Sequence, residues 1–270
     1  MTRLSDVMAA VDALWPIAGA EEWDSPGLLS GDPAAPVTRI VLAVDAVSDT
    51  VDEALKNGAE LLLVHHPLLL RGVTTVAETT AKGALLARLI RGRCALIAAH
   101  TNADIVATGT SARLASLLGL RDARPIVETA PGVGLGRVGA LPEPTTLGAL
   151  ARRLAGILPP TATGVRVAGQ FDRSVQIIAV CGGAGDSLLT SAAVRAADVY
   201  VTADLRHHPA SEAVETARVA GGPALIDVSH WASEWLWLET ASEELRAALP
   251  DVEVLVSELR TDPWDFVVVQ

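Results

Sequence analysis

The six histidines of this 270-residue chain gather in three segments instead of spreading along it. His65 and His66 lie in VHHPLL, His100 lies in AAHTNAD, and the last third holds three more, His207, His208 and His230. A single histidine at a strand end is more often a hydrogen-bonded structural group than a metal ligand. Their joint arrangement, with carboxylates nearby, favours a metal site.

The first two clusters each follow a short hydrophobic run, 59–64 and 94–99, that reads as a buried strand. Open α/β sheets bind their ligands at the carboxyl ends of the strands. Asp104 lies four residues after His100 in a polar loop. We therefore expect His65, His66, His100 and Asp104 at one edge of a sheet.

Each of these groups also has a purely structural interpretation. Adjacent strand residues point to opposite faces, so the histidine pair can converge only where the strand ends, and Pro67 favours such a turn. The pair could equally cap that turn. Asp104 could cap a helix around 108–119, although Thr108 and Thr110 are better placed for that role.

His230 and Glu234 are four residues apart in SHWASEWLWLE, at the start of a helical segment. Residues at this spacing share a helix face, so an imidazole and a carboxylate are presented together. The alternative is a solvated His/Glu pair, but the neighbouring tryptophans indicate a largely buried helix.

The resulting donors are imidazole nitrogens and carboxylate oxygens, because Cys94 and Cys181 lie in hydrophobic runs and read as reduced, packed thiols. Such a set suits Zn, Mn, Fe, Co or Ni. A carboxylate can bridge two such ions, and a water held between them ionises near neutral pH. Hydrolysis is the chemistry that this favours.

The elements that must position these residues alternate between strand and helix. Strands are expected at 38–46, 59–64 and 94–99, with helices at 48–58 and 79–92. The order recurs as a strand at 175–183, a helix at 187–197, a strand at 198–204 and a helix from about 209. Shifting AELLLV by 138 residues places it on ADVYVT, and the same shift places Ile40 on Ile178.

We therefore predict an α/β protein of two intertwined, internally duplicated lobes, with mixed, largely parallel sheets flanked by helices. The lobes are expected over 1–125 and 126–270, intertwined as one domain. Glycines and prolines between 121 and 145 indicate a turn-rich connection. Its GVGLGRVG segment lacks the helix and acidic residue of a dinucleotide-binding unit, so no such cofactor is expected.

Composition excludes several classes of function. A net charge of −11 disfavours a nucleic-acid surface. The apolar runs are shorter than the roughly 20 residues that span a bilayer. The N-terminus lacks the apolar core of a secretory signal, so a cytoplasmic location is expected.

With these residues identified, the chain closely resembles the Nif3-like family, the YbgI group labelled GTP cyclohydrolase 1 type 2 homologues. The resemblance runs nearly end to end. It is carried by five segments in a fixed order: EEWDSPGLLSGDP (21–33), AELLLVHHPL (59–68), AAHTNAD (98–104), VYVTADLRHH (199–208) and SHWASE (229–234).

This resemblance implies a site for two divalent ions per chain in a duplicated fold. Matching motifs assign the metal ligands, with Glu234 as the bridge between the ions: His65, His66, Asp104, His230 and Glu234. His100 either ligates an ion or orients a ligand, and His208 is a candidate proton donor. The stretch 121–165 is too short for the inserted domain of some relatives, so this is the short form.

The family usually has glycine where this chain has Ala203 and Ser229. Neither is a ligand, but Ala203 could crowd substrate contacts near Asp204. The resemblance also implies a homo-oligomer, a six-membered ring, and a small, nucleotide-like substrate. Arg71 and Arg206 lie beside histidine motifs and could bind phosphate, although solvated surface charges are the simpler interpretation. A metal-binding scaffold or regulatory partner without turnover is the alternative function.

Overall fold

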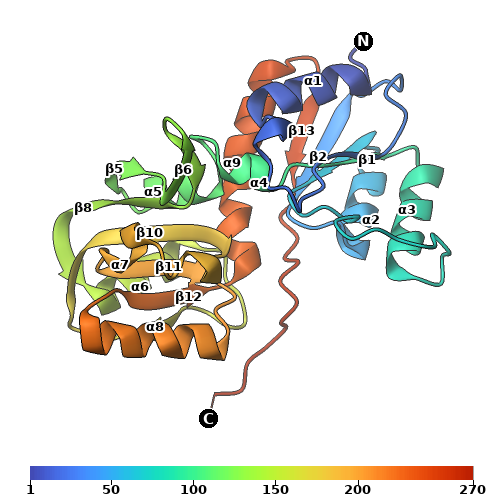
Figure 1. Cartoon of the computed structure of the whole chain (residues 1–270). Helices are drawn as coiled ribbons and strands as arrows, with labels where there is room; N and C mark the ends of the chain where they lie inside the picture. The colour runs from blue at the N-terminus through green and yellow to red at the C-terminus, as the bar shows by residue number, and fades with distance from the viewer. Residues whose placement is uncertain (270) are drawn as a thin grey trace. The chain divides into compact units, whose positions relative to one another are not determined.

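The computed structural model describes residues 1–269 and consists of two compact units, each built from separate stretches of chain (Figure 1). Among the described residues, the first unit holds 1–103 and 238–261, and the second holds 104–237 and 262–269. The chain therefore passes from one unit to the other three times. The lobes expected over 1–125 and 126–270 stay a prediction. They were defined as the two halves of a duplicated sequence, whereas the two units are defined by compactness.

The first unit is built on a five-stranded sheet in the order β1–β4–β3–β2–β13. All neighbouring strands run parallel except β1, which pairs antiparallel with β4. The strands are β1 (Gly27–Ser30), β2 (Arg39–Ala43), β3 (Leu61–Val64), β4 (Ala95–Ala98) and β13 (Glu253–Val256). The three strands predicted at 38–46, 59–64 and 94–99 are confirmed as β2, β3 and β4.

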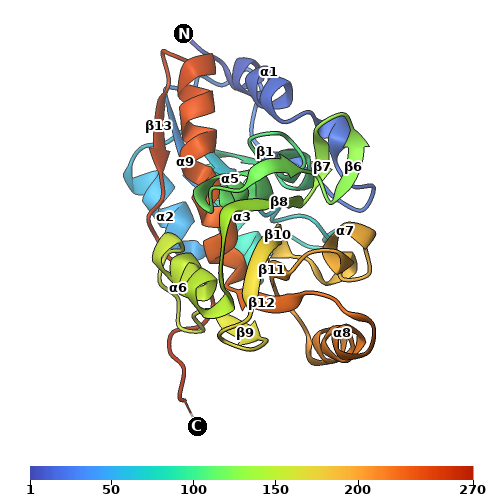
Figure 2. The same ribbon diagram turned by 90° about the vertical axis from the view of Figure 1, so that its left-hand side faces the viewer.

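Helices cover both faces of this sheet, which explains why strands β3 and β4 are apolar at every position. On one face Val51 of α2 and Leu85 and Leu89 of α3 pack with Leu62 and Leu96 of the sheet. Residues 238–248 of α9 and helix α1 lie on the other face (Figures 1 and 2). The helices are α1 (Leu4–Leu14), η1 (Ile17–Gly19), α2 (Ser48–Lys56), α3 (Ala81–Arg91) and α9 (His230–Ala248). The helices predicted at 48–58 and 79–92 are thereby confirmed.

The second unit is built on a six-stranded mixed sheet in the order β5–β8–β10–β11–β12–β9. Only the central pairs β10–β11 and β11–β12 are parallel. Its strands are β5 (Arg121–Arg124), β8 (Arg137–Thr146), β9 (Arg166–Ala168), β10 (Ser174–Ala184), β11 (Val199–Ala203) and β12 (Ala224–Val228), with a separate hairpin of β6 (Val127–Ala130) and β7 (Val133–Leu135).

The remaining helices lie at the start of the second unit or between its strands in the sequence. They are α4 (Thr101–Asp104), at the boundary between the units, α5 (Thr110–Leu117), α6 (Leu147–Ile157), η2 (Asp186–Leu188), α7 (Ala192–Arg195) and α8 (His207–Ala220). The longest helix of the chain, α9, has 19 residues. Within residues 1–269 no helix combines the length and the apolar character that crossing a membrane requires.

The strand registers support the internal duplication. In the first sheet Ile40 pairs with Leu61, and in the second Ile178 pairs with Val199. One shift of 138 residues relates both members of these pairs (178 minus 40, 199 minus 61). Both pairs are parallel, so the two halves repeat the same strand–crossover–strand unit.

The segment 121–145 is wrongly predicted as a turn-rich connection, because it forms β5, β6, β7 and most of β8. Its glycines serve close strand contacts as well as turns. A Cβ at Gly134 (φ +154°) would lie 2.0 Å from the carbonyl oxygen of Val127 on the paired strand. Glycine here lets two backbones approach each other within a hairpin.

The helix predicted at 187–197 is also interrupted, since η2 ends at Leu188 and α7 begins at Ala192. The Ser191 side chain accepts a hydrogen bond from the Val194 amide and so caps a new helix. Serine competes with the helical backbone in this way and favours helix starts over helix interiors.

Both cysteines are buried and reduced, as predicted. Burial raises the pKa of the Cys94 and Cys181 thiols to about 12, from an ordinary value of 9.0.

Because only the thiolate reacts, we expect alkylation of these two thiols at neutral pH to be about a thousandfold slower than alkylation of a free thiol. Mass spectrometry after iodoacetamide treatment should find both thiols unmodified in the folded protein and modified in urea; rapid labelling of the native protein would contradict this.

Glu60 should make stability depend on pH. Its carboxylate accepts hydrogen bonds from the amides of Thr38 (3.0 Å) and Arg39 (2.9 Å). Burial raises its pKa, but these bonds outweigh burial, so the net pKa is lowered from 4.5. A lowered pKa stabilises the fold above the unfolded-state value, and this contribution disappears as pH falls through the folded-state value.

We therefore expect Glu60→Gln to lower the free energy of unfolding by about 1 kcal/mol at pH 7, solvent screening keeping the effect small. The difference from wild type should shrink as the pH falls below 4.5 and Glu60 becomes protonated in the folded state. Urea unfolding over a series of pH values measures it, and a difference that stays constant through the acidic range would rule out the charge as its origin.

Candidate metal centre

The first unit brings three histidines together where parallel strands end. His65 and His66 directly follow β3, and His100 follows β4 by two residues. Their ring centroids are 5.1 Å (His65 to His66), 5.1 Å (His65 to His100) and 5.5 Å (His66 to His100) apart. One ring nitrogen of each lies within 4.8 Å of the others. The expectation that both clusters meet at one sheet edge is confirmed for these histidines.

The Nδ1 atom of each of these rings is held by a hydrogen-bond acceptor. That of His65 donates to the Ala99 carbonyl oxygen at 2.8 Å. Those of His66 and His100 donate to the carboxylates of Asp45 (2.7 Å) and Asp24 (2.8 Å). Because a carbonyl or an ionised carboxylate can only accept, the proton of the neutral ring sits on Nδ1 and the lone pair on Nε2. Metal-binding histidines in proteins are oriented in this way.

Asp24 is itself fixed in place, and its side chain is fully buried. It accepts hydrogen bonds from the Thr101 amide (3.0 Å) and hydroxyl (2.5 Å) as well as from His100. Burial raises the pKa of Asp24, but the bonds from Thr101 and His100 outweigh it, so the net pKa is lowered. The carboxylate therefore stays ionised at neutral pH and keeps His100 in one orientation.

In the second unit, His230 and Glu234 lie on the first turn of α9, as predicted. His230 Nε2 is 2.9 Å from Glu234 Oε1, and its Nδ1 is 2.8 Å from Asp204 Oδ2. Burial lowers the pKa of His230, but the two carboxylates outweigh burial and raise it to about 11. His230 thus holds a proton between two carboxylates, and it must release that proton to bind a cation.

The start of α9 is set by Ser229, one of the two departures from the family pattern. Its hydroxyl accepts a hydrogen bond from the Ala232 amide (3.2 Å) and donates one to Asp262 (2.5 Å). This is the geometry of a serine N-cap. The departure from glycine therefore gives the helix that carries His230 a defined first residue.

Gly183 lies against the His230–Glu234 pair. Its φ of +68° is in the left-handed region, and an added Cβ would lie 2.3 Å from Glu234 Oε1 and 3.2 Å from His230 Nε2. Its amide donates to Ser233 Oγ at 2.9 Å, and Ser233 Oγ donates to the His230 carbonyl oxygen at 2.8 Å. The carboxyl end of β10 is thus fixed to the turn that carries the candidate ligands.

Asp104 and His208 also belong to the second unit. Asp104 Oδ1 accepts a hydrogen bond from Thr110 Oγ1 at 2.6 Å. Thr110 is therefore not the helix cap that was predicted: the N-cap of α5 is Gly109, and the threonine hydroxyl is used to hold Asp104. His208 lies in the first turn of α8, with its ring 5.1 Å from that of His207.

Sequence reasoning missed the residues that orient the ligands: Asp24, Asp45, Asp204, Gly183 and Ser233. Asp24, Asp204 and Ser233 stand in the EEWDSPG, VYVTADLRHH and SHWASE segments of the family resemblance, which was the available signal. Asp45 and Gly183 lie outside the five segments, so no motif marked them.

The donors present fit a divalent cation. Three imidazole nitrogens in the first unit and an imidazole–carboxylate pair in the second form a nitrogen and oxygen set without thiolate. The 2.9 Å between His230 Nε2 and Glu234 Oε1 allows both atoms to bind one ion, since ligand distances of about 2.1 Å place neighbouring donors about 3 Å apart.

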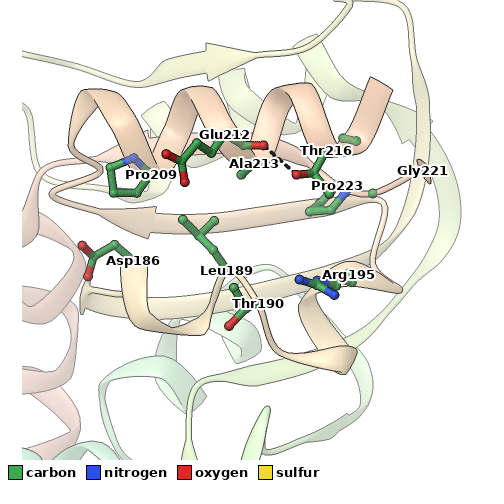
Figure 3. A pocket seen from close by; sticks show the side chains of 12 residues that line it. Asp186, Leu189, Thr190, Arg195, Pro209, Glu212, Ala213, Thr216, Gly221 and Pro223 are labelled. Atoms are coloured by element: carbon green, nitrogen blue, oxygen red, sulfur yellow. Dashed lines mark hydrogen bonds between the residues drawn. The ribbon is translucent and has the colours of Figure 1, made fainter. Parts of the chain in front are cut away.

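A separate cavity of about 350 Å³ lies between α8 and the η2–α7 segment (Figure 3). Asp186, Arg195 and Glu212 are its charged residues, and Asp186 is ion-paired with Arg206 at 2.6 Å. Among residues 1–269, no histidine lines this cavity. It is thus distinct from the clusters described above.

Comparison with known proteins assigns the family and the fold. A model of the family Duf34/NIF3 (NGG1p interacting factor 3) matches residues 2–263. The chain belongs to the Duf34/NIF3 family. A Bacillus cereus protein related to NIF3 shares the fold, with a TM-score of 0.89 over 98% of this chain and 99% of that one, at 22% identity.

Two sequence relatives in the Duf34/NIF3 family carry the name GTP cyclohydrolase 1 type 2 homolog. The Streptomyces coelicolor protein is 47% identical over 98% of this chain and 94% of its own length. The Mycobacterium tuberculosis protein is 37% identical over 97% of both chains, but its alignment spans 375 positions. That relative therefore carries inserted residues, which confirms this chain as the short form.

Proposed function

We propose that this member of the Duf34/NIF3 family is a metal-dependent hydrolase that acts on a small, nucleotide-like substrate. Two divalent ions per chain would be held by His65, His66, Asp104, His230 and Glu234. The observation that carries the proposal is the first-unit histidine cluster, in which each Nδ1 is held by an acceptor. Metal-binding histidines in proteins are oriented by acceptors of this kind.

Each residue has a defined task in this proposal. Two divalent ions, when bound, would supply Lewis acidity and would lower the pKa of a water bound to them. Glu234, 3% exposed, has two carboxylate oxygens and is the proposed bridge. Asp24 and Asp45 keep His100 and His66 in orientation, and Asp104 is held by Thr110. His208 is the proposed proton donor.

The names of the relatives support GTP as the substrate to test first. Water would add to C8 of the purine, the imidazole ring would open, and hydrolysis of the resulting formamide would release formate. Both arginines considered for phosphate binding are exposed, and Arg206 is paired with Asp186. Because the chain is strongly acidic, we expect slow turnover.

The test follows formate release and loss of purine absorbance with metal-loaded wild type and Asp104→Ala. Activity in wild type that falls at least a hundredfold in the variant supports the hydrolase. Equal rates would assign the activity to contamination. Full metal content without turnover of any phosphorylated or cyclic substrate would favour the metal-binding scaffold instead.

We further propose that the chain assembles into a homo-oligomer, a ring of six copies. Light scattering at micromolar concentration should give about six times the mass of 28.0 kDa. A monomeric mass would contradict this assembly.

A further inference from the structure

Trp23 stands exposed beside the first-unit histidines. Its side chain is 60% exposed, and its ring centroid lies 5.8 Å from that of His100 with an interplanar angle of 80°. An indole offers a large apolar surface that a protein normally buries. Here that surface meets solvent next to a candidate metal ligand.

The loop around Trp23 is held firmly although the indole is not buried. Asp24, the next residue, is fully buried and bonded to His100 and Thr101. The Glu21 amide donates to Thr101 Oγ1 at 3.0 Å, and the Asp24 amide donates to the Glu21 carbonyl oxygen at 3.0 Å. Two anchors thus flank the indole, so its position beside His100 costs little entropy when a ligand arrives.

We propose that Trp23 is a stacking platform for a planar heteroaromatic ring of the substrate, an inference that rests on the proposed function. A second contribution to selectivity comes from charge. Glu21 and Glu22 are exposed beside the indole and disfavour phosphate there. The ring end of the substrate is therefore placed on Trp23 and the anionic end toward the cations.

The expected effect follows from the strength of such contacts. Stacking of a base on an aromatic side chain corresponds to about 5- to 150-fold in affinity. Trp23→Ala should weaken ring binding by that factor, and Trp23→Phe should restore part of it because a smaller aromatic face remains.

The structure offers a control in Trp264, an indole of nearly equal exposure (61%) in the C-terminal segment. The probes are guanosine monophosphate and ribose 5-phosphate, which lacks the ring. Binding to the metal-loaded protein is followed by quenching of tryptophan fluorescence and by calorimetry in wild type, Trp23→Ala, Trp23→Phe and Trp264→Ala. Metal content is measured in all four proteins.

The platform is supported if guanosine monophosphate binds at least fivefold more weakly to Trp23→Ala alone, with Trp23→Phe intermediate and metal content unchanged. It is overturned if Trp23→Ala binds this probe as tightly as wild type, if wild type does not bind it, or if ribose 5-phosphate binds equally well. Loss of metal in Trp23→Ala would also overturn it, since the indole would then act structurally. If wild type itself holds no metal, the proposed function fails. Guanosine binding to metal-free wild type, Trp23→Ala and Trp23→Phe then tests the stacking platform by the same criterion.

Discussion

Replacing Glu234 with glutamine is expected to remove at least one of two divalent ions from each chain. Glutamine keeps the size of the side chain but has no charge and only one oxygen, so it cannot bridge two cations. Metal analysis after reconstitution should find two ions in wild type and one or none in the variant. Because the ions would bind only the native state, each bound ion should also add about 2.7 kcal/mol to the stability of wild type at a hundredfold excess of metal over its Kd.

Glu243→Gln is the matched control, because Glu243 is exposed on the same helix α9. It removes the same charge from the chain without touching the His230–Glu234 pair, so it should keep both ions. Circular dichroism should show both variants folded. One ion or none in all three proteins would contradict the two-metal proposal.

Gly183→Ala is expected to disrupt the ligand pair of the second unit without destroying the fold. The added methyl group would meet Glu234 Oε1 at 2.3 Å, so the carboxylate must move away from His230. The left-handed backbone adds about 1–2 kcal/mol of strain. We expect the variant to lose at least tenfold in affinity for divalent ions, measured by titration with a chelator.

Gly164→Ala separates the two effects. Gly164 has a similar φ of +60°, but an added Cβ there meets nothing within 4 Å. This variant should lose comparable stability in urea unfolding and yet bind metal as wild type does. If both variants bind metal equally, the contact between Gly183 and Glu234 has no role in the site.

The order of strands and helices could largely be predicted from the sequence because its signals are local. Runs such as LLLV and ALIA are apolar at every position and end in histidine, so both the strand and its carboxyl end were readable. The His230–Glu234 pair was equally readable from its spacing of four. The segment 121–145 was misread because its glycines let strands approach each other closely. In a sequence, glycines with this role look the same as glycines in turns.

The orienting carboxylates could not be predicted, because their partners are distant in the chain. Asp24 binds His100 across 76 residues, Asp204 binds His230 across 26, and Asp45 binds His66 across 21. Under the shift of 138 residues that relates the halves, Asp45 falls on Gly183 and His66 on Asp204. The duplication thus repeats the positions of the site residues but not their residue types. The site residues of one half therefore do not predict those of the other half.

The interleaving of the two units has a consequence for how the chain folds during synthesis. Strand β13 pairs with β2, so about 210 residues separate these neighbours in the first sheet. Until β13 leaves the ribosome, β2 presents an unpaired edge, whereas the second sheet is complete once β12 has emerged at Val228. The N-terminal sheet is therefore the last to be finished, in contrast to the usual N-terminal-first order. A chain stopped before Glu253 would expose that edge to other nascent chains.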